Sequence, residues 1–268
     1  MGHWLQCDAR PGALARMATL LCAILWVGGC TPTRLFHADF EADTIGHQPN
    51  ASPPTAPAGD YITYVPVPGG VEQLEISSLM GKSVMVRSTP AANPVAFVGI
   101  EKSYGNNPVY AIYNGASLGV AAAGPGVSIA LASGHHVSAV AITFKNGKVY
   151  KGFPSDASAA NLLGDIPYAE PHVVVISINP AAKTYNLSIL QSAAADILRT
   201  NQPIANDAFF DSERLMLAVH PEAGGEAGNP MYVMDDVLIT QKEPSTVALE
   251  ADAVGKPRTL PARQADGP

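Results

Sequence analysis

The feature that most restricts the fold is a long succession of short apolar segments, rich in β-branched residues and separated by turn residues. Between Tyr61 and Thr240 the pattern predicts about ten to twelve strands. The clearest segments are residues 82–87, 95–100, 109–113, 127–131, 136–144, 172–178, 184–189, 214–220 and 231–240. Strands at this spacing favour a sandwich or barrel over alternating strands and helices.

Turn residues join some of these segments into hairpins. Asn146-Gly147 stands between two apolar runs, which is a strong signal for a tight hairpin. Residues 179–183 form a second such turn. Helical patterning is confined to residues 157–163 and 192–198, each about two turns long. The sequence therefore predicts an all-β protein with short helices only.

The first 29 residues have the layout of a secretory signal peptide. Arg10 and Arg16 precede an apolar run over residues 17–26, and small residues follow at 27–29. Residues 17–29 are shorter than the roughly 20 residues that a membrane-spanning helix requires. Cys30 comes directly after the small residues, and this arrangement resembles the lipobox of bacterial lipoproteins.

That resemblance implies that Cys30 is lipidated and becomes the first residue of the mature protein. The lipid would hold the protein on the bacterial cell envelope without spanning the membrane. Thr31, where an Asp would favour the inner membrane, points to the outer membrane. The alternative is an ordinary signal peptide with an incidental cysteine. The other two cysteines, Cys7 and Cys22, lie within the leader, so the mature domain would have no disulfide.

The charge balance restricts the classes of partner. The chain has 16 Lys and Arg against 23 Asp and Glu, a net charge of −7, and no basic cluster. An acidic chain of this kind is a poor partner for nucleic acid. The expected contact with the membrane is therefore through the lipid anchor.

Two segments at opposite ends of the β region carry a family resemblance. Residues 36–46 read FHADFEADTIG, and residues 231–239 read MYVMDDVLI. They resemble the opening and closing strands of concanavalin A-like (laminin-G-like) jelly rolls. The resemblance implies a two-sheet antiparallel jelly-roll sandwich in which the first and last strands pair.

The resemblance completes the expected domain organisation. Residues 1–29 form the signal peptide, and residues 30–35 form a tether. Residues 36–240 form the β-sandwich domain. Residues 241–268, with several prolines and no periodicity, are expected to be a disordered tail.

The same resemblance implies a candidate calcium site. Related carbohydrate-binding sandwiches hold a structural Ca²⁺ near acids of the opening and closing strands. The acids available here are Asp39, Glu41, Asp43 and Asp236. Ca²⁺ requires six to eight oxygen ligands, and these acids would supply some of them if the two strands are adjacent. The alternative is that they are solvated or cap turns.

The candidate ligand-binding residues are Tyr104, Asn106, Asn107 and Tyr110. They place aromatic rings and two amides on or beside a loop, where binding residues often lie. Such a combination suits a sugar, which stacks on a ring and exchanges hydrogen bonds with amides. The alternative is that the tyrosines pack within strands and that the asparagines form a turn.

Catalytic patterns in the chain are incomplete. Glu41-x-Asp43 resembles the start of a laminarinase-type signature, but no third acid follows at the required spacing. Residues 115–119 match G-x-S-x-G, with Asp196 and His220 as formal partners of Ser117, but no helical pattern follows. No catalytic residue is assigned.

The expected function is a non-catalytic envelope lipoprotein that binds a glycan or another envelope component, such as a protein. Two alternatives stay open. One is a polysaccharide-active hydrolase or lyase of the same fold. The other is a structural or assembly lipoprotein.

Overall fold

The computed structural model describes residues 34–49, 74–88, 95–101, 105–118, 125–134, 137–212, 214–222, 229–241 and 243–244. The strands are β1 (Arg34–Ala38), β2 (Leu74–Ser77), β3 (Ser83–Arg87), β4 (Val95–Glu101), β5 (Val109–Ser117), β6 (Val127–Ser133), β7 (Ser138–Lys145), β8 (Lys148–Lys151), β9 (Leu162–Asp165), β10 (Pro171–Asn179), β11 (Thr184–Gln191), β12 (Ile197–Pro203), β13 (Arg214–Pro221) and β14 (Pro230–Thr240). Three short 3-10 helices are η1 (Pro154–Asp156), η2 (Ala159–Asn161) and η3 (Asp207–Asp211). None of the helices in these ranges is long and apolar enough to cross a membrane.

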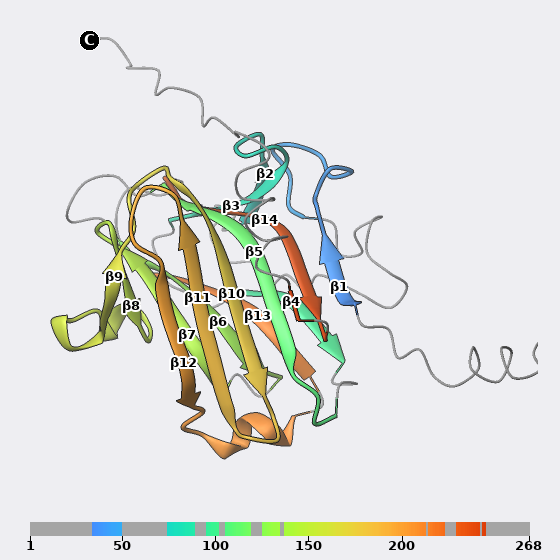
Figure 1. Cartoon of the computed structure of the whole chain (residues 1–268). Helices are drawn as coiled ribbons and strands as arrows, with labels where there is room; N and C mark the ends of the chain where they lie inside the picture. Colours follow the sequence, from blue (N-terminus) through green and yellow to red (C-terminus); the bar gives the residue numbers. More distant parts are fainter. Residues whose placement is uncertain are drawn as a thin grey trace, which may run out of the picture. The chain divides into compact units, whose positions relative to one another are not determined.

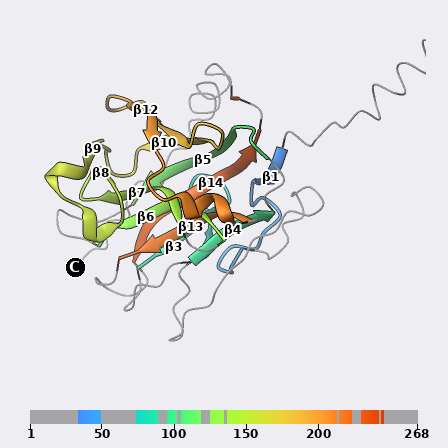
Figure 2. The ribbon, with the colours of Figure 1, turned by 90° about the horizontal axis from the view of Figure 1, so that it is seen from below.

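The strands form two antiparallel sheets. The large sheet has eight strands in the order β12-β11-β10-β5-β14-β3-β2, with β1 paired to β14. The small sheet has six strands in the order β4-β13-β6-β7-β8-β9. In Figure 1, β10, β11 and β12 lie in front of β6 and β7, and Figure 2 shows the two layers from below, with η3 in front. The predicted fold class, an all-β, two-sheet antiparallel jelly-roll sandwich, is confirmed.

The first and last strands of the sandwich pair, as the resemblance implied. Strand β1 runs antiparallel to the second half of β14, where Ala38 lies opposite Val237. Strand β3 pairs with the first half of β14, where Met234 lies opposite Val84. Because β14 pairs with β5 along its other side, both ends of the domain are held inside the large sheet.

The predicted hairpins are present where the turn residues stand. Asn146 and Gly147 have φ angles of 56° and 69°, and positive φ at both central residues is the geometry of a type I′ turn. In the turn between β10 and β11, the Asn179 side chain accepts a hydrogen bond from the Ala182 amide at 3.1 Å. A type I′ turn such as Asn146-Gly147 matches the right-handed twist of the strands that it joins.

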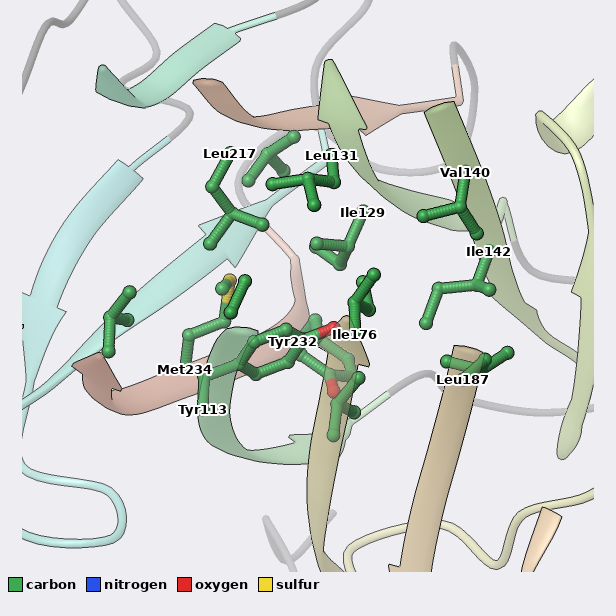
Figure 3. Packing of buried hydrophobic residues seen from close by; sticks show 14 of the residues in the cluster. Tyr113, Ile129, Leu131, Val140, Ile142, Ile176, Leu187, Leu217, Tyr232 and Met234 are labelled. Carbon is green, nitrogen blue, oxygen red and sulfur yellow. The ribbon is translucent and has the colours of Figure 1, made fainter. Parts of the chain in front are cut away.

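The core lies between the two sheets. Alternate residues of each strand point inward, so that Ile176, Tyr113 and Tyr232 of the large sheet face Ile129 and Leu131 of the small sheet (Figure 3). All five are fully buried. One continuous hydrophobic cluster of this size explains why a domain without a disulfide can be stable.

The prediction of helices in two segments is wrong. Residues 157–163 contain only the single 3-10 turn η2 and then enter β9. Residues 192–198 lead into β12, which begins at Ile197. Both segments are too short to be stable as isolated helices, and each lies beside a sheet edge that can pair with it. The strands β2, β9 and β12 were not predicted individually.

Candidate functional site

The two sheets approach each other where their edge strands β9 and β12 meet. The Arg199 Nη2 atom of β12 donates to the Leu163 carbonyl oxygen of β9 at 3.0 Å. A Cβ atom on Gly164 would lie 2.8 Å from Cγ1 of Ile197, so glycine permits this close approach. These contacts join the large and small sheets at one side of the sandwich.

A cavity of about 210 Å³ lies next to this junction. Its lining residues come from β7, β8, η2, β9, β11 and β12: Val140, Ala141, Ile142, Lys151, Ala160, Asn161, Leu162, Leu163, Tyr185, Leu187, Arg199 and Gln202. Val140, Ile142, Tyr185 and Leu187 of this lining also belong to the core cluster. In Figure 3, Val140, Ile142 and Leu187 lie on one side of the cluster, beyond Ile176. The cavity is therefore an opening at the side of the core between the sheets.

Hydrogen bonds to the backbone hold the polar lining residues in place. Asn161 Nδ2 donates to the carbonyl oxygen of Asp156 at 2.8 Å. Gln202 Nε2 donates to the carbonyl oxygen of Thr200 at 2.9 Å. Each amide NH₂ group therefore has a fixed direction, which preorganises these side chains for a ligand.

The charged residues of this lining are two cations, Lys151 and Arg199. In addition to its bond with Leu163, Arg199 donates a hydrogen bond from Nη1 to the Leu198 carbonyl oxygen at 2.7 Å. Among the described residues, no carboxylate forms an ion pair with Arg199 or Lys151. Burial raises the pKa of Tyr185, and the positive charge of Arg199 acts in the opposite direction. The cavity thus combines an aromatic ring, two amides and two positive charges.

The ligand-binding residues predicted from the sequence lie away from this cavity. Asn106 and Asn107 are exposed in the turn before β5, and Tyr104 lies outside the described residues. Tyr110 is half-buried on β5, between Ser177 of β10 and Thr240 of β14. Burial raises the pKa of Tyr110, and the charge of Glu243 adds to this effect. Of the predicted residues that the structure describes, Asn106, Asn107 and Tyr110 are not part of the cavity lining.

The candidate calcium ligands flank the start of the turn after β1. The register of β1 and β14 ends at the Ala38–Val237 pair, so Asp39 follows next to Asp236 along the ladder. Asp236 accepts a hydrogen bond from Asn114 Nδ2 at 3.0 Å, and Glu41 is exposed. Asp43 is 2% exposed.

A lysine ammonium already contacts this turn. Lys82 Nζ donates to the carbonyl oxygens of Glu41 and Asp43 at 2.7 and 2.9 Å. Within the described ranges, no three acidic, histidine or cysteine side chains gather in a metal-binding group. Calcium at Asp39, Glu41, Asp43 and Asp236 stays a prediction.

The formal partners of Ser117 in the G-x-S-x-G match lie outside β5, directly before β12 and on β13. Ser117 is the last residue of β5 in the large sheet and is 4% exposed. His220 lies on β13 in the small sheet, with its ring 4.9 Å from that of Phe153. Asp196 accepts a hydrogen bond from the Gln191 amide at 3.0 Å. A nucleophile elbow exposes its serine between a strand and a helix, and the buried Ser117 at the end of β5 in the large sheet does not match that geometry.

A buried histidine forms a separate polar group in the core. The Tyr232 hydroxyl lies 2.6 Å from His172 Nε2, and His172 Nδ1 lies 3.2 Å from the carbonyl oxygen of Glu170. Because a carbonyl oxygen only accepts, Nδ1 carries the proton and Nε2 accepts from Tyr232. The Phe144 ring packs on both residues. Burial lowers the pKa of His172 to about 4, so this histidine is neutral in the folded protein at pH 7.

The cavity residues were not predicted because β12 was interpreted as a helix end. Arg199 and Gln202 stand in the segment ILRTNQP, whose Ile197 is buried and whose Leu198 is exposed. This alternation, followed by Pro203, was the available signal for an edge strand. Tyr185 was recognised as part of a strand, but its position at a cavity depends on the small sheet.

The comparisons with known proteins concern the fold. No protein-family model matches the chain, and no curated protein matches it. Among solved structures, it is similar to a protein of unknown function from Shewanella oneidensis MR-1, with 9% identity and a TM-score of 0.49 over 92% of this chain and 100% of that chain. It is also similar to a GH131 β-glucanase catalytic domain from Podospora anserina, with 10% identity and a TM-score of 0.49 over 80% and 98% of the two chains. A third is an acidic lectin from winged bean in complex with methyl-α-D-galactose, with 12% identity and a TM-score of 0.47 over 66% and 94%.

Proposed function

We propose that this protein is an envelope-anchored lipoprotein whose β-sandwich binds a glycan without catalysing its breakdown. The observation that carries the proposal is the cavity beside β9 and β12. It is lined by Tyr185, which is 4% exposed, by the amides of Asn161 and Gln202, and by the guanidinium group of Arg199. Rings and planar hydrogen-bonding groups match the two kinds of surface on a sugar, its C–H face and its hydroxyl edge.

The size of the cavity suits one sugar unit. Sites for drug-sized ligands measure roughly 300–1,000 Å³, so a volume near 210 Å³ matches a smaller group. A terminal residue or a side branch of a polysaccharide would enter the cavity, while the rest of the chain stays outside. Leu162 is 39% exposed and lies in the lining, so it would contact the neighbouring sugar.

The chemistry of the lining favours binding over hydrolysis. Canonical glycoside hydrolysis uses two carboxyl groups that flank the scissile bond. The polar groups that the described lining supplies are amides, a phenol and two cations. These groups hold and orient a sugar, but they do not form the acid and nucleophile pair.

The lipid anchor would hold the sandwich close to the membrane. Three residues, 31–33, separate Cys30 from β1, and four fully extended residue steps span at most about 14 Å. β1 pairs with β14, whereas β12 is the far strand of the same sheet, five positions from β1, which corresponds to about 24 Å. The cavity side of the large sheet therefore lies away from β1, the strand that follows the proposed anchor.

The test of glycan binding uses the full chain in detergent on a panel of polysaccharides and peptidoglycan fragments, with calcium and with EDTA. Asn161→Ala and Gln202→Ala should weaken any saturable binding, and Asn106→Ala serves as the matched control. Loss of binding in Asn106→Ala alone would move the site to the start of β5. Loss of binding in EDTA would support calcium at the acids near β1. Absence of binding across the panel would contradict the proposal and favour a protein partner in an assembly role.

The anchor is tested independently. Cells that express the full chain are labelled with a palmitate analogue, and Cys30→Ala is compared with Cys22→Ala. The wild type and Cys22→Ala should carry the label on a shortened chain, whereas Cys30→Ala should remain unlabelled and unprocessed. Equal labelling of Cys30→Ala would contradict lipidation at this residue.

A further inference from the structure

We infer that the sugar recognised in the cavity carries a carboxylate, as in a uronic acid, and that Arg199 and Lys151 bind this group. The inference rests on the proposed glycan binding and narrows the class of ligand. It depends on the charge and the geometry of the two cations at the junction of β9 and β12.

Arg199 is held in a fixed position. Nη2 donates to the Leu163 carbonyl oxygen at 3.0 Å, and Nη1 donates to the Leu198 carbonyl oxygen at 2.7 Å. A guanidinium group has five N–H donors in one plane, so these two bonds leave further donors in the same fork. Immobilising the group in advance reduces the entropy that a ligand would lose on binding.

Lys151 adds a second positive charge to the same lining. It is the last residue of β8 and lies opposite Ile142, whose side chain forms part of the cavity wall. Its ammonium group is exposed, so it can move to meet an anionic ligand. A flexible cation beside a fixed guanidinium is suited to a ligand whose negative charge lies at the mouth of the cavity.

Arg199 and Lys151 differ in their partners from the basic residues that form ion pairs. Arg87, Lys145, Lys148 and Lys183 each bind a carboxylate of the protein at 2.6–2.9 Å. Among the residues that the structure describes, Arg199 and Lys151 have no such partner, although the chain as a whole is acidic. Two like charges at one cavity repel each other, and an anionic ligand would relieve this repulsion.

A carboxylate fits this arrangement better than a neutral hydroxyl group. Arginine and carboxylate form two parallel charge-assisted hydrogen bonds, which are about twice as strong as neutral ones. The Tyr185 ring would then contact the C–H face of the same sugar. The cavity volume of about 210 Å³ suits one such ring, and the acid group would remain at the rim near Lys151.

The experiment measures binding of the full-length protein to oligomers of galacturonate, glucuronate, mannuronate and guluronate by calorimetry. Each oligomer is paired with its carboxyl-reduced, neutral counterpart, and dextran sulfate serves as an anionic polymer without carboxylates. We expect at least one uronate oligomer to bind about 10- to 100-fold more tightly than its neutral counterpart, which corresponds to one charge-assisted contact.

The variants are Lys151→Gln, Arg199→Gln and Arg199→Lys, with Lys148→Gln as the matched control. Lys148 lies on β8, as Lys151 does, but outside the cavity lining. The substitution Lys148→Gln therefore removes the same charge without changing the cavity. Lys151→Gln and Arg199→Gln should lose the preference for the uronate, whereas Lys148→Gln should keep it. Because Arg199 also joins the two sheets, circular dichroism and thermal unfolding confirm that each variant is folded, and the exposed Lys151 provides a test that does not depend on Arg199.

The outcomes separate this inference from the proposed function. Equal affinity for a uronate and its neutral counterpart, or binding only to neutral glycans of the wider panel, would overturn the inference and leave glycan binding intact. Equal binding of dextran sulfate would show a general attraction to polyanions and would also overturn it. Failure of every glycan, charged or neutral, would overturn both. Unchanged uronate preference in Lys151→Gln and Arg199→Gln would exclude these cations as the binding groups.

Discussion

His172 shows how burial decides the behaviour of a single residue. Its ring is 2% exposed, accepts a hydrogen bond from Tyr232 and donates one to the backbone at Glu170. Protonation of Nε2 would break the bond from Tyr232 and would place a charge inside the core. The neutral ring is therefore part of the folded state.

We predict that the protein loses stability as the pH falls from about 6.5 towards 4. The folded-state pKa of His172 is lowered from 6.5 to about 4, so protons bind preferentially to the unfolded chain in this range. The stability contributed by the neutral ring is complete above pH 6.5, and its loss by pH 4 corresponds to about 3 kcal/mol. Urea unfolding at a series of pH values measures the effect.

The control for this prediction is His172→Gln, which keeps a hydrogen-bonding side chain but does not titrate. This variant should be less stable than the wild type at pH 7, and its stability should change less between pH 6.5 and 5. An equal pH dependence in both proteins would assign the effect to other groups.

Gly115 is required by packing rather than by catalysis. A Cβ atom at this position would lie 2.2 Å from the Tyr232 hydroxyl oxygen. We predict that Gly115→Ala lowers the free energy of unfolding by about 1–3 kcal/mol, as overpacking of a core does. Urea unfolding measures the loss. In the background of Tyr232→Phe, which removes the hydroxyl, the same substitution should cost less, and an equal cost would contradict the steric explanation.

Residue-scale chemistry was only partly predictable from the sequence. The G-x-S-x-G match pointed to Ser117, but the structure gives Gly115 a steric role beside Tyr232. Tyr232 stands 117 positions further along the chain than Gly115, and a short motif contains no information about such a neighbour. Contacts between side chains of different strands could therefore not be predicted from a short sequence motif.

At the scale of elements, Lys82 connects the turn after β1 to the start of β3. Its two hydrogen bonds to the carbonyl oxygens of Glu41 and Asp43 bring together residues about 40 positions apart. The same turn is tied to β2, because the Gly46 amide donates to Ile76 and the Ile76 amide donates to His47. The turn therefore depends on contacts with two later strands.

We predict that Lys82→Met destabilises the domain by about 1–2 kcal/mol, because two carbonyl oxygens lose a charged donor. Hydrogen exchange at the Gly46 and Ile76 amides should become faster than in the wild type. Lys148→Met is the control, since its pair with Asp165 is exposed and should contribute little. Unchanged exchange at Gly46 in Lys82→Met would contradict this role of the ammonium group.

The central strands were predictable, and so was the apolar edge strand β4, but the edge strands β2, β9 and β12 were not. Segments such as β6, β10 and β14 contain long runs of apolar residues because both of their faces are largely covered. The strands β2, β9 and β12 lie at the edges of the two sheets and are short or largely polar. Their pairing depends on a neighbouring strand, so the local pattern was weak.

At the scale of the whole molecule, the pairing of β1 with β14 unites the two ends of the domain. Phe36 is fully buried in the core and lies opposite Ile239. The fold is thus complete only when the first strand joins the last one.

We predict that Phe36→Ala lowers the free energy of unfolding by about 3–5 kcal/mol, as expected for a large side chain removed from a core. Leu35→Ala, at the neighbouring half-buried position, should cost clearly less. Urea unfolding followed by circular dichroism compares the two variants. Equal losses would indicate that β1 does not pack its alternate residues as the structure shows.

The sequence by itself determined the all-β class, the two turn-centred hairpins and the pairing of the terminal strands. The class and the hairpins follow from local periodicity and from turn residues such as Asn146-Gly147, and the pairing follows from what the family resemblance of the two end segments implies. Only the tertiary structure decided where a ligand could bind. The cavity unites β7, β8, η2, β9, β11 and β12, and its cations become neighbours only where the edges of two separate sheets meet. A linear pattern records which faces are apolar, but the meeting of distant edges depends on how the whole chain packs.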